Sequence, residues 1–243
     1  MKKIINSILG LLNLKTIKAK HLNNSNKQGY ISANETVKSA QKEGLSVCDY
    51  VENIWDQKGE TQKVIDNMEK FGVFQNANPS ICEIGAGTGR YMEKVIAKCD
   101  PSYYESYETA SDWADWLQKE YSIISQPTDG FSLSSTLHNS IDIVHAHGVF
   151  VYLNFLDNIR CFNEMIRVIK PGGIIIFDCF TEECMTTDIL EKWLKSKHNF
   201  PVVISNDYII NYFIKNNFRL LGNFFNSYGQ GKSKYFVFKR INH

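Results

Sequence analysis

The sequence lacks the paired cysteines, the charge excess and the internal repeats that mark several large classes of protein. Its six cysteines form no C-x-x-C pair and no regular spacing, which excludes a cysteine zinc site and a disulfide framework and favours a reduced, cytoplasmic protein. The formal net charge of +1 gives no basic excess for nucleic-acid phosphates, so we expect no nucleic-acid partner. No low-complexity linker divides the 243 residues, and their 43% apolar content fits one substantial core.

The chain also lacks a long uninterrupted apolar run near its start. Residues 4–14 are too few to span a bilayer, Asn6 and Asn13 interrupt them, and no small-residue cleavage site of a signal peptide follows. An amphipathic helix would place four apolar residues on one face: Ile5, Ile8, Leu9 and Leu12. We expect this face of residues 1–20 to dock on its own domain or on a partner subunit of a homo-oligomer, with peripheral membrane contact as the alternative.

The most informative segment is residues 81–91, where a short apolar run ends in an acidic, glycine-rich loop. Residues 81–84 predict a buried strand, and the pattern E-x-G-x-G-x-G occupies residues 83–89. Glycines let the chain turn sharply and let its backbone approach a ligand. The helical pattern that follows points free N–H groups back at that ligand. Its apolar face consists of Met92, Val95, Ile96 and Cys99. The segment predicts a nucleotide-like cofactor at the end of a first strand.

The spacing of the glycines distinguishes between classes of cofactor. The dinucleotide fingerprint G-x-G-x-x-G/A would need a small residue where Arg90 or Met92 stands. The phosphate loop G-x-x-x-x-G-K-[ST] is absent. A carboxylate at Glu83 would repel a pyrophosphate and suits a cofactor that carries an ammonium group.

The pattern resembles the first motif of the class I methyltransferases that depend on S-adenosylmethionine (SAM). The methionine end of SAM carries an α-ammonium and no pyrophosphate, which explains why an acid stands at the position of Glu83. The resemblance implies an α/β fold: a seven-stranded, mostly parallel, doubly wound sheet with an antiparallel last strand. It also implies that the loop contacts SAM through Glu83, Gly85, Ala86, Gly87 and Gly89.

A second acid is expected about 20 residues further on, at the end of the second strand, to hold the ribose hydroxyls. The segment of residues 102–110 predicts a strand that ends in Glu108, and Thr109 follows as a further cofactor contact. Glu105 is the alternative if the strand ends earlier.

A third predicted strand, residues 121–125, precedes Asp129 and Gly130. In methyltransferases an acid or amide at this place contacts the adenine, and the resemblance assigns that role to Asp129. The alternative is structural, because Asp-Gly is a common turn dipeptide.

Later segments agree with the resemblance in the same order. Asp142 opens a buried strand that leads to His147, and the helix over residues 154–170 ends in Lys-Pro-Gly-Gly before the strand 174–178. Residues 207–215 predict a helix. Two aromatic-rich strands, residues 218–225 and 235–239, predict a terminal hairpin whose last strand is inserted antiparallel in the sheet.

The sequence pattern before the first strand predicts helices. We therefore divide the chain into an N-terminal helical extension or cap, residues 1–75, and a SAM-binding core, residues 76–243, within one structural domain. By the resemblance, Tyr50 and Trp55 wall the acceptor pocket, while packing between helices is the alternative for both.

Methyl transfer is an in-line displacement in which the protein aligns acceptor and methyl group and removes a proton where one must leave. His147 is the foremost base candidate, because an unshifted histidine has a pKa of about 6.5. A contact with the cofactor and a packed strand end are its alternatives. His145 should point the same way, deeper in the strand. Weaker candidates are Tyr91, Tyr152, Asp178 and Glu182.

The absence of two sequence patterns bears on the kind of acceptor and on whether the reaction uses a metal. The Asn/Asp-Pro-Pro-Tyr element of methyltransferases that act on bases is missing after the fourth strand, so a small acceptor is preferred. No pair of acids with an Asn has the spacing of a metal-dependent family member, so we predict no bound metal.

The resulting hypothesis is a cytoplasmic, SAM-dependent methyltransferase that releases S-adenosylhomocysteine. Its expected acceptor is an oxygen of a sugar or of a phosphate-type precursor in surface-polysaccharide (capsule or O-antigen) biosynthesis. One alternative is a catalytically silent methyltransferase-like protein that binds SAM. Another is an NAD-dependent oxidoreductase, which shares the sheet, although Arg90 and Glu83 argue against it.

Overall fold

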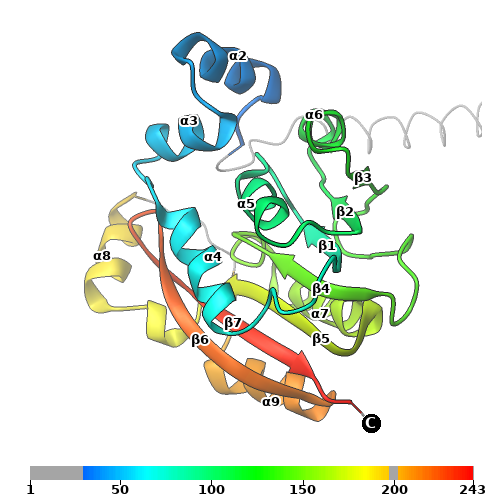
Figure 1. Cartoon of the computed structure of the whole chain (residues 1–243). Helices are drawn as coiled ribbons and strands as arrows, with labels where there is room; N and C mark the ends of the chain where they lie inside the picture. The colour runs from blue at the N-terminus through cyan, green and yellow to red at the C-terminus, as the bar shows by residue number, and fades with distance from the viewer. Residues whose placement is uncertain (1–29, 197–201, 243) are drawn as a thin grey trace, which may run out of the picture. The chain divides into compact units, whose positions relative to one another are not determined.

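The computed structural model describes residues 30–196 and 202–242, and its centre is a seven-stranded sheet (Figure 1). The strands are β1 (Ser80–Ile84), β2 (Tyr103–Tyr107), β3 (Ile124–Ser125), β4 (Ile141–Ala146), β5 (Ile169–Cys179), β6 (Phe218–Tyr228) and β7 (Gly231–Arg240). Their order is β3-β2-β1-β4-β5-β7-β6. The first five are parallel, and β7 lies between β5 and β6, antiparallel to both. The predicted fold class, with its inserted last strand, is confirmed.

Helices surround this sheet on both faces (Figure 1). In chain order they are α2 (Ala33–Glu43), α3 (Val47–Ile54), α4 (Glu60–Lys70), α5 (Arg90–Cys99), α6 (Ser111–Tyr121), α7 (Phe155–Val168), the short 3₁₀ helix η1 (Glu182–Cys184), α8 (Thr187–Ser196) and α9 (Asn206–Lys215). One buried cluster joins α4, α5 and α6 to the sheet, and another joins α7 and α9 to it. Ile143 belongs to the first cluster and Val144 to the second, because successive side chains of a strand face opposite ways.

The helices before β1 lie in the same compact unit as the sheet, which spans residues 33–243. Ser46 caps α3 by accepting a hydrogen bond from the Asp49 N–H at 3.0 Å. The buried carboxylate of Glu52 accepts the N–H groups of Gly59 and Thr61 at the start of α4. The boundary at residue 75 stays a prediction, and residues 1–20 lie outside the described part of the chain.

Several predicted strand boundaries were wrong, including those of the terminal hairpin, where β6 extends to Tyr228 and β7 begins at Gly231. Residues 121–125 were predicted as a strand, but Tyr121 ends α6 and only Ile124–Ser125 pair with β2. The Tyr121 hydroxyl donates to Glu93 on α5 at 3.2 Å, which holds the tyrosine in the helix layer. The strand predicted from residue 174 begins at Ile169, because the Pro-Gly-Gly segment continues along β4 through an irregular register.

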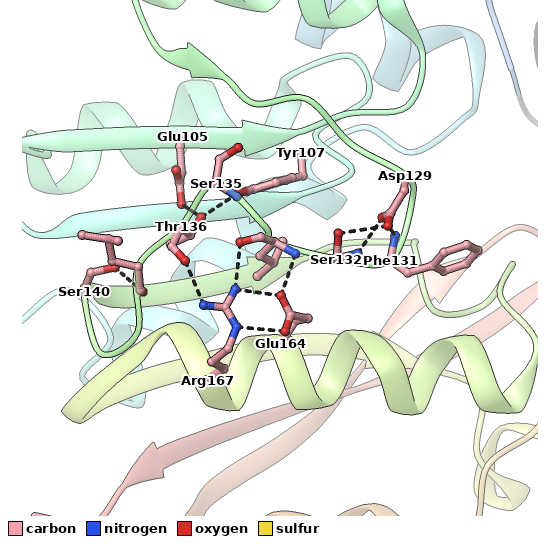
Figure 2. A network of polar contacts seen from close by, with 12 residues as sticks. Glu105, Tyr107, Asp129, Phe131, Ser132, Ser135, Thr136, Ser140, Glu164 and Arg167 are labelled. Carbon is pink, nitrogen blue, oxygen red and sulfur yellow. Dashed lines mark hydrogen bonds and ion pairs between the residues drawn. The ribbon is translucent and has the colours of Figure 1, made fainter. Parts of the chain in front are cut away.

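A polar network ties the connection from β3 to β4 to the elements on either side of it (Figure 2). Arg167 of α7 donates to the carbonyl oxygens of Leu133 at 2.8 Å and Thr136 at 2.9 Å, and its guanidinium pairs with Glu164. The Thr136 hydroxyl donates to Glu105 of β2 at 2.5 Å. Bonds to both a helix and a strand therefore fix a segment that has little regular structure of its own.

The described residues contain no helix that is both long enough and apolar enough to cross a membrane. All six cysteines are free thiols, and five of them are buried, where a reduced thiol packs as a small apolar group.

Candidate active site

The glycine-rich loop joins the carboxyl end of β1 to α5. Gly85, Gly87 and Gly89 have φ values of 66°, 52° and 75°, in the left-handed region that favours glycine. A Cβ at Gly85 would lie 2.6 Å from Val149, and one at Gly89 would lie 2.6 Å from Leu117. A Cβ at Gly87 would meet no atom within 4 Å. The first and third glycines thus accommodate the protein's own packing, whereas Gly87 borders open space.

Glu108 follows β2 directly, and its carboxylate is bonded to this loop. Oε2 accepts the Gly87 N–H at 2.7 Å and Oε1 accepts the Ala110 N–H at 2.6 Å. Each carboxylate oxygen has a second lone pair for another donor. Glu105 lies in the middle of β2, is fully buried and accepts the Thr136 hydroxyl, so the acid at the loop is Glu108. Its contact with a ribose stays a prediction.

Glu83, His145 and His147 come together at the carboxyl ends of β1 and β4. Glu83 is paired in register with His145, and His147 follows two residues later. His145 Nδ1 lies 3.0 Å from His147 Nε2 and 3.8 Å from Glu83 Oε1. His145 is fully buried and His147 is 9% exposed, which confirms that both side chains point the same way with His145 deeper.

Two tyrosines that the sequence analysis did not single out hold the outer nitrogens of these rings. The Tyr104 hydroxyl lies 3.0 Å from His145 Nε2, and the Tyr235 hydroxyl lies 3.3 Å from His147 Nδ1. Tyr104 also donates to Glu83 Oε2 at 2.6 Å. The side-chain alternation of β2 could have indicated Tyr104. No local pattern indicates Tyr235, because β7 reaches this place only through its insertion beside β5.

Burial shifts the pKa values of these groups. It raises the pKa of Glu83 to about 8, although the hydrogen bond from Tyr104 opposes the shift. It lowers the pKa of His145 to about 3 and that of His147 well below its ordinary value, with the charge of Arg90 also contributing at His147. The ordinary pKa on which the base assignment of His147 was argued therefore does not hold. Both imidazoles are neutral at neutral pH, the form that accepts a proton or binds a metal ion.

The first residues of α5 connect this group with the segment that follows α3. Tyr91 stacks on His147 with ring centroids 3.8 Å apart. The Arg90 guanidinium lies 5.1 Å from the centroid of the Tyr91 ring and 5.2 Å from that of Trp55. Arg90 also donates to the side chain of Gln57 at 2.9 Å. Trp55 thus lies next to the start of α5, and the pocket roles predicted for Tyr50 and Trp55 both stay predictions.

The other catalytic candidates lie after β4, near the carboxyl end of β5 and just after β5. Tyr152 is 41% exposed, and its ring centroid is 6.3 Å from that of Tyr228. Asp178 accepts the Gly148 N–H at 2.7 Å, and burial raises its pKa to about 6. Glu182 accepts the N–H of the first residue of α9. Asp178 therefore positions the residue after His147, and Glu182 contributes to the start of a helix.

Asp129 and Gly130 lie in the segment after β3. Asp129 Oδ1 accepts the N–H groups of Phe131 at 2.9 Å and Ser132 at 2.7 Å, and these bonds lower the pKa of the carboxyl (Figure 2). The Thr109 methyl group lies 3.7 Å from where a Cβ of Gly130 would be. The segments that follow β2 and β3 thus meet where an open α/β sheet binds ligands. An adenine contact of Asp129 stays a prediction.

Comparison with known families assigns a domain to this site. Residues 82–177 match the family model described as "Methyltransferase domain". The match runs from β1 to β5 and includes the glycine loop, Glu108 and both histidines. No curated protein matches the chain. The chain therefore carries a methyltransferase domain.

Solved structures with a similar fold include methyltransferases of several kinds and also the [4+2]-cyclase SpnF. A putative sarcosine dimethylglycine methyltransferase from Galdieria sulphuraria aligns with a TM-score of 0.57 and 12% identity over 75% of this chain and 85% of its own. Magnesium protoporphyrin IX methyltransferase from Synechocystis PCC 6803 aligns with a TM-score of 0.57 and 10% identity, over 99% of this chain and 100% of its own. The N-methyltransferase NodS from Bradyrhizobium japonicum WM9 aligns with a TM-score of 0.57 and 14% identity, over 84% of this chain and 98% of its own. At these identities the likeness concerns the fold.

Proposed function

We propose that this chain, which carries a methyltransferase domain in a class I fold, transfers the methyl group of SAM to a small polar acceptor. The observation that carries the proposal is the pair formed by Gly87 and Glu108. Gly87 borders open space at the start of α5, and a carboxylate with spare lone pairs is bonded to its N–H group. The Synechocystis and Bradyrhizobium structures contain S-adenosylhomocysteine, which supports SAM as the methyl donor.

The donor extends across the carboxyl ends of the first strands. Glu108 accepts the ribose hydroxyls, and Thr109, Asp129 and Gly130 lie on the adenine side. Glu83 and His147 lie on the methionine side, where Glu83 Oε1 is the carboxylate oxygen that Tyr104 leaves open. The backbone of the loop contacts the donor at Gly85, Ala86, Gly87 and Gly89.

The acceptor lies on the side of His147, Tyr91 and Tyr152. In the reaction the bond from sulfur to methyl breaks, the acceptor forms the new bond to the methyl carbon, and S-adenosylhomocysteine leaves. A hydroxyl acceptor must also lose its proton. We assign the task of taking it to His147, which is neutral but is a weak base because burial lowers its pKa. Tyr91 fixes the ring by stacking, and Tyr152 is exposed enough to contact the acceptor.

The acceptor class that we propose is an oxygen on a sugar or a phosphate-type precursor, in the cytoplasm. The net charge of +1 and the His-Gly sequence after β4, where enzymes acting on bases carry Asn/Asp-Pro-Pro-Tyr, support a small acceptor. Surface-polysaccharide biosynthesis is the proposed setting.

The proposal is tested by calorimetric titration of the wild type and of Glu108→Ala with SAM and S-adenosylhomocysteine. Loss of hydrogen bonds from the ribose to a carboxylate costs about 1.5–3 kcal/mol, which corresponds to at least roughly ten-fold in Kd. We expect the wild type to bind both ligands and the variant to bind them at least ten-fold more weakly. Thermal unfolding checks that the variant, which also loses the bonds to Gly87 and Ala110, remains folded.

Glu105→Gln is the control, because Glu105 is a buried glutamate of β2, three residues before Glu108, and its carboxylate accepts the Thr136 hydroxyl and no N–H group of the loop. Folded wild type that does not bind SAM would overturn the proposal, and tight NADH binding in its place would favour the oxidoreductase. SAM binding without transfer of a labelled methyl group to any of a panel of sugars, nucleotides and phosphorylated metabolites would favour the catalytically silent protein.

A further inference from the structure

A cluster of three potential metal ligands lies beneath the glycine loop. Glu83, His145 and His147 each offer one atom, and these atoms all lie within 4.8 Å of one another. His145 Nδ1 is 3.0 Å from His147 Nε2 and 3.8 Å from Glu83 Oε1. Ligands about 2.0–2.2 Å from a tetrahedral Zn²⁺ lie roughly 3.3–3.6 Å from one another. The two distances from His145 Nδ1 therefore lie on either side of the separation expected between ligands of one bound ion.

The bonds around the cluster leave these same atoms facing its centre, where His145 Nδ1 and His147 Nε2 share one hydrogen bond that a bound ion would replace. The outer nitrogen of His145 meets the Tyr104 hydroxyl, and that of His147 meets the Tyr235 hydroxyl. Tyr104 also occupies Glu83 Oε2, which leaves Oε1 on the side of the histidines. Histidines that bind metals almost always donate their other ring N–H to a protein acceptor, which fixes the tautomer and the ring orientation. Two tyrosine oxygens supply that arrangement here.

The charge balance of the cluster also calls for a cation. Glu83 is 1% exposed, and His145 is the one basic side chain within 4.0 Å of its carboxylate among the described residues. A buried carboxylate without a charged partner must take up a proton or a cation. A divalent ion that binds one carboxylate and two neutral imidazoles would satisfy all three side chains at once.

We propose that Glu83, His145 and His147 bind one divalent transition-metal ion of the Zn²⁺ type through Oε1, Nδ1 and Nε2. Two imidazoles and one carboxylate form a ligand set that suits Zn²⁺ better than Mg²⁺ or Ca²⁺, which prefer oxygen. Three protein ligands leave a coordination position for water or for an oxygen of a bound molecule. The sequence analysis considered only sets of acids with an Asn, and Glu83 lies too far along the chain from His145 to suggest this one.

The inference goes beyond methyl transfer and does not depend on it. The ion would take the place of the donor's ammonium group as the cation beside Glu83, and it would occupy the nitrogen of His147 that faces the cluster. Glu108 and Gly87 remain available to the donor in either case. Metal binding measured without SAM, and SAM binding measured without metal, therefore succeed or fail separately.

The test uses the full chain, purified without a histidine tag, stripped with a chelator and titrated with Zn²⁺ against a chromophoric chelator. We expect one Zn²⁺ per chain. Glu83→Gln and His147→Gln should each weaken binding by at least about 100-fold. Tyr104→Phe keeps the ring and every proposed ligand but loses the outer hydroxyl, and should weaken binding by about 10–100-fold. Co²⁺ as a substitute ion should give the visible absorption of a four- or five-coordinate site in the wild type.

Two controls separate this site from adventitious binding. Glu105→Gln changes an equally buried glutamate on the next strand, and His138→Gln changes an exposed histidine. Both should bind Zn²⁺ like the wild type. Circular dichroism shows which variants fold, and the Co²⁺ spectrum of the wild type does not depend on any variant. Absence of stoichiometric Zn²⁺ binding, or equal binding by wild type and folded Tyr104→Phe and His147→Gln, would overturn the proposal.

Discussion

Gly87 and Gly89 have similar backbone conformations, with φ values of 52° and 75°, but different surroundings. The Cβ position of Gly89 lies 2.6 Å from Leu117 of α6, whereas that of Gly87 is open. Two glycines of one motif therefore have different structural roles. Gly89 lets α5 approach α6, and Gly87 lets a ligand approach the backbone.

Alanine at each of these glycines should separate stability from binding. Gly89→Ala combines left-handed strain with overpacking, each about 1–3 kcal/mol, and should lower the free energy of unfolding by roughly 2–4 kcal/mol. Gly87→Ala should lower it by only about 1–2 kcal/mol, yet weaken SAM binding at least ten-fold. Urea unfolding and calorimetry measure the two quantities. SAM binding by Gly87→Ala at wild-type affinity would show that the open space is not the donor's place.

Among the elements, those with local patterns were predicted well. Helical periodicity gave α5, α7 and α9 within a few residues, and apolar runs gave β1 and β4. The strand predicted over residues 121–125 failed, because contacts of Tyr121 with α5 and not local propensity decide where α6 ends. The connection from β3 to β4 has no periodicity at all, and its position depends on Arg167 and Thr136 (Figure 2).

Replacement of Arg167 should loosen that connection. Arg167→Met keeps the apolar stem but removes the guanidinium donor from the Leu133 and Thr136 carbonyl oxygens and from the Glu164 carboxylate. The Leu133 carbonyl and Glu164 each keep one backbone N–H donor, so we expect a loss of roughly 1–3 kcal/mol in the free energy of unfolding. Arg160→Met is the control on the same helix. Its pair with Asp157 has an arginine side chain that is 64% exposed, so the change should stay within about 1 kcal/mol. Equal effects of the two variants in urea unfolding would contradict this account of the network.

At the scale of the whole molecule, strand order brings distant residues to one edge of the sheet. The insertion of β7 between β5 and β6 carries Tyr235 to His147, and Asp178, near the end of β5, bonds to the segment that follows β4. Burial of carboxyl groups at this edge also makes the stability of the protein depend on pH. Asp178 is 1% exposed, and its pKa is raised to about 6.

The sign of that coupling can be measured with Asp178→Asn. The folded state holds the Asp178 proton more tightly than the unfolded state, so the contribution of this group is present below about pH 4 and is lost as pH rises through about 6. Asn keeps an oxygen for the Gly148 N–H and does not titrate. Relative to wild type, the variant should gain up to roughly 3 kcal/mol in unfolding free energy between pH 4 and pH 7.5.

Asp142→Asn provides the opposite case for that comparison. Burial acts to raise the pKa of Asp142, but hydrogen bonds from Lys170 and Ser80 lower it below its ordinary value. Its contribution is therefore lost only as pH falls below about 4, and the difference from wild type should stay nearly constant from pH 4.5 to pH 7.5. A pH-independent difference for Asp178→Asn as well would show that its carboxyl group does not titrate as described.

The sequence by itself determined the fold class, the glycine loop with its two acids, and the presence of two histidines at the carboxyl end of β4. Local sequence patterns predict these features, because the periodicity of strands and helices, the glycines of turns and the spacing between motif residues all lie within at most about 30 residues. Only the tertiary structure decided which carboxylate meets the loop, that Tyr104 and Tyr235 hold the two histidines, and that Glu83 joins them. Those contacts link residues up to 88 positions apart, and strand order and register set such distances, which no local pattern encodes.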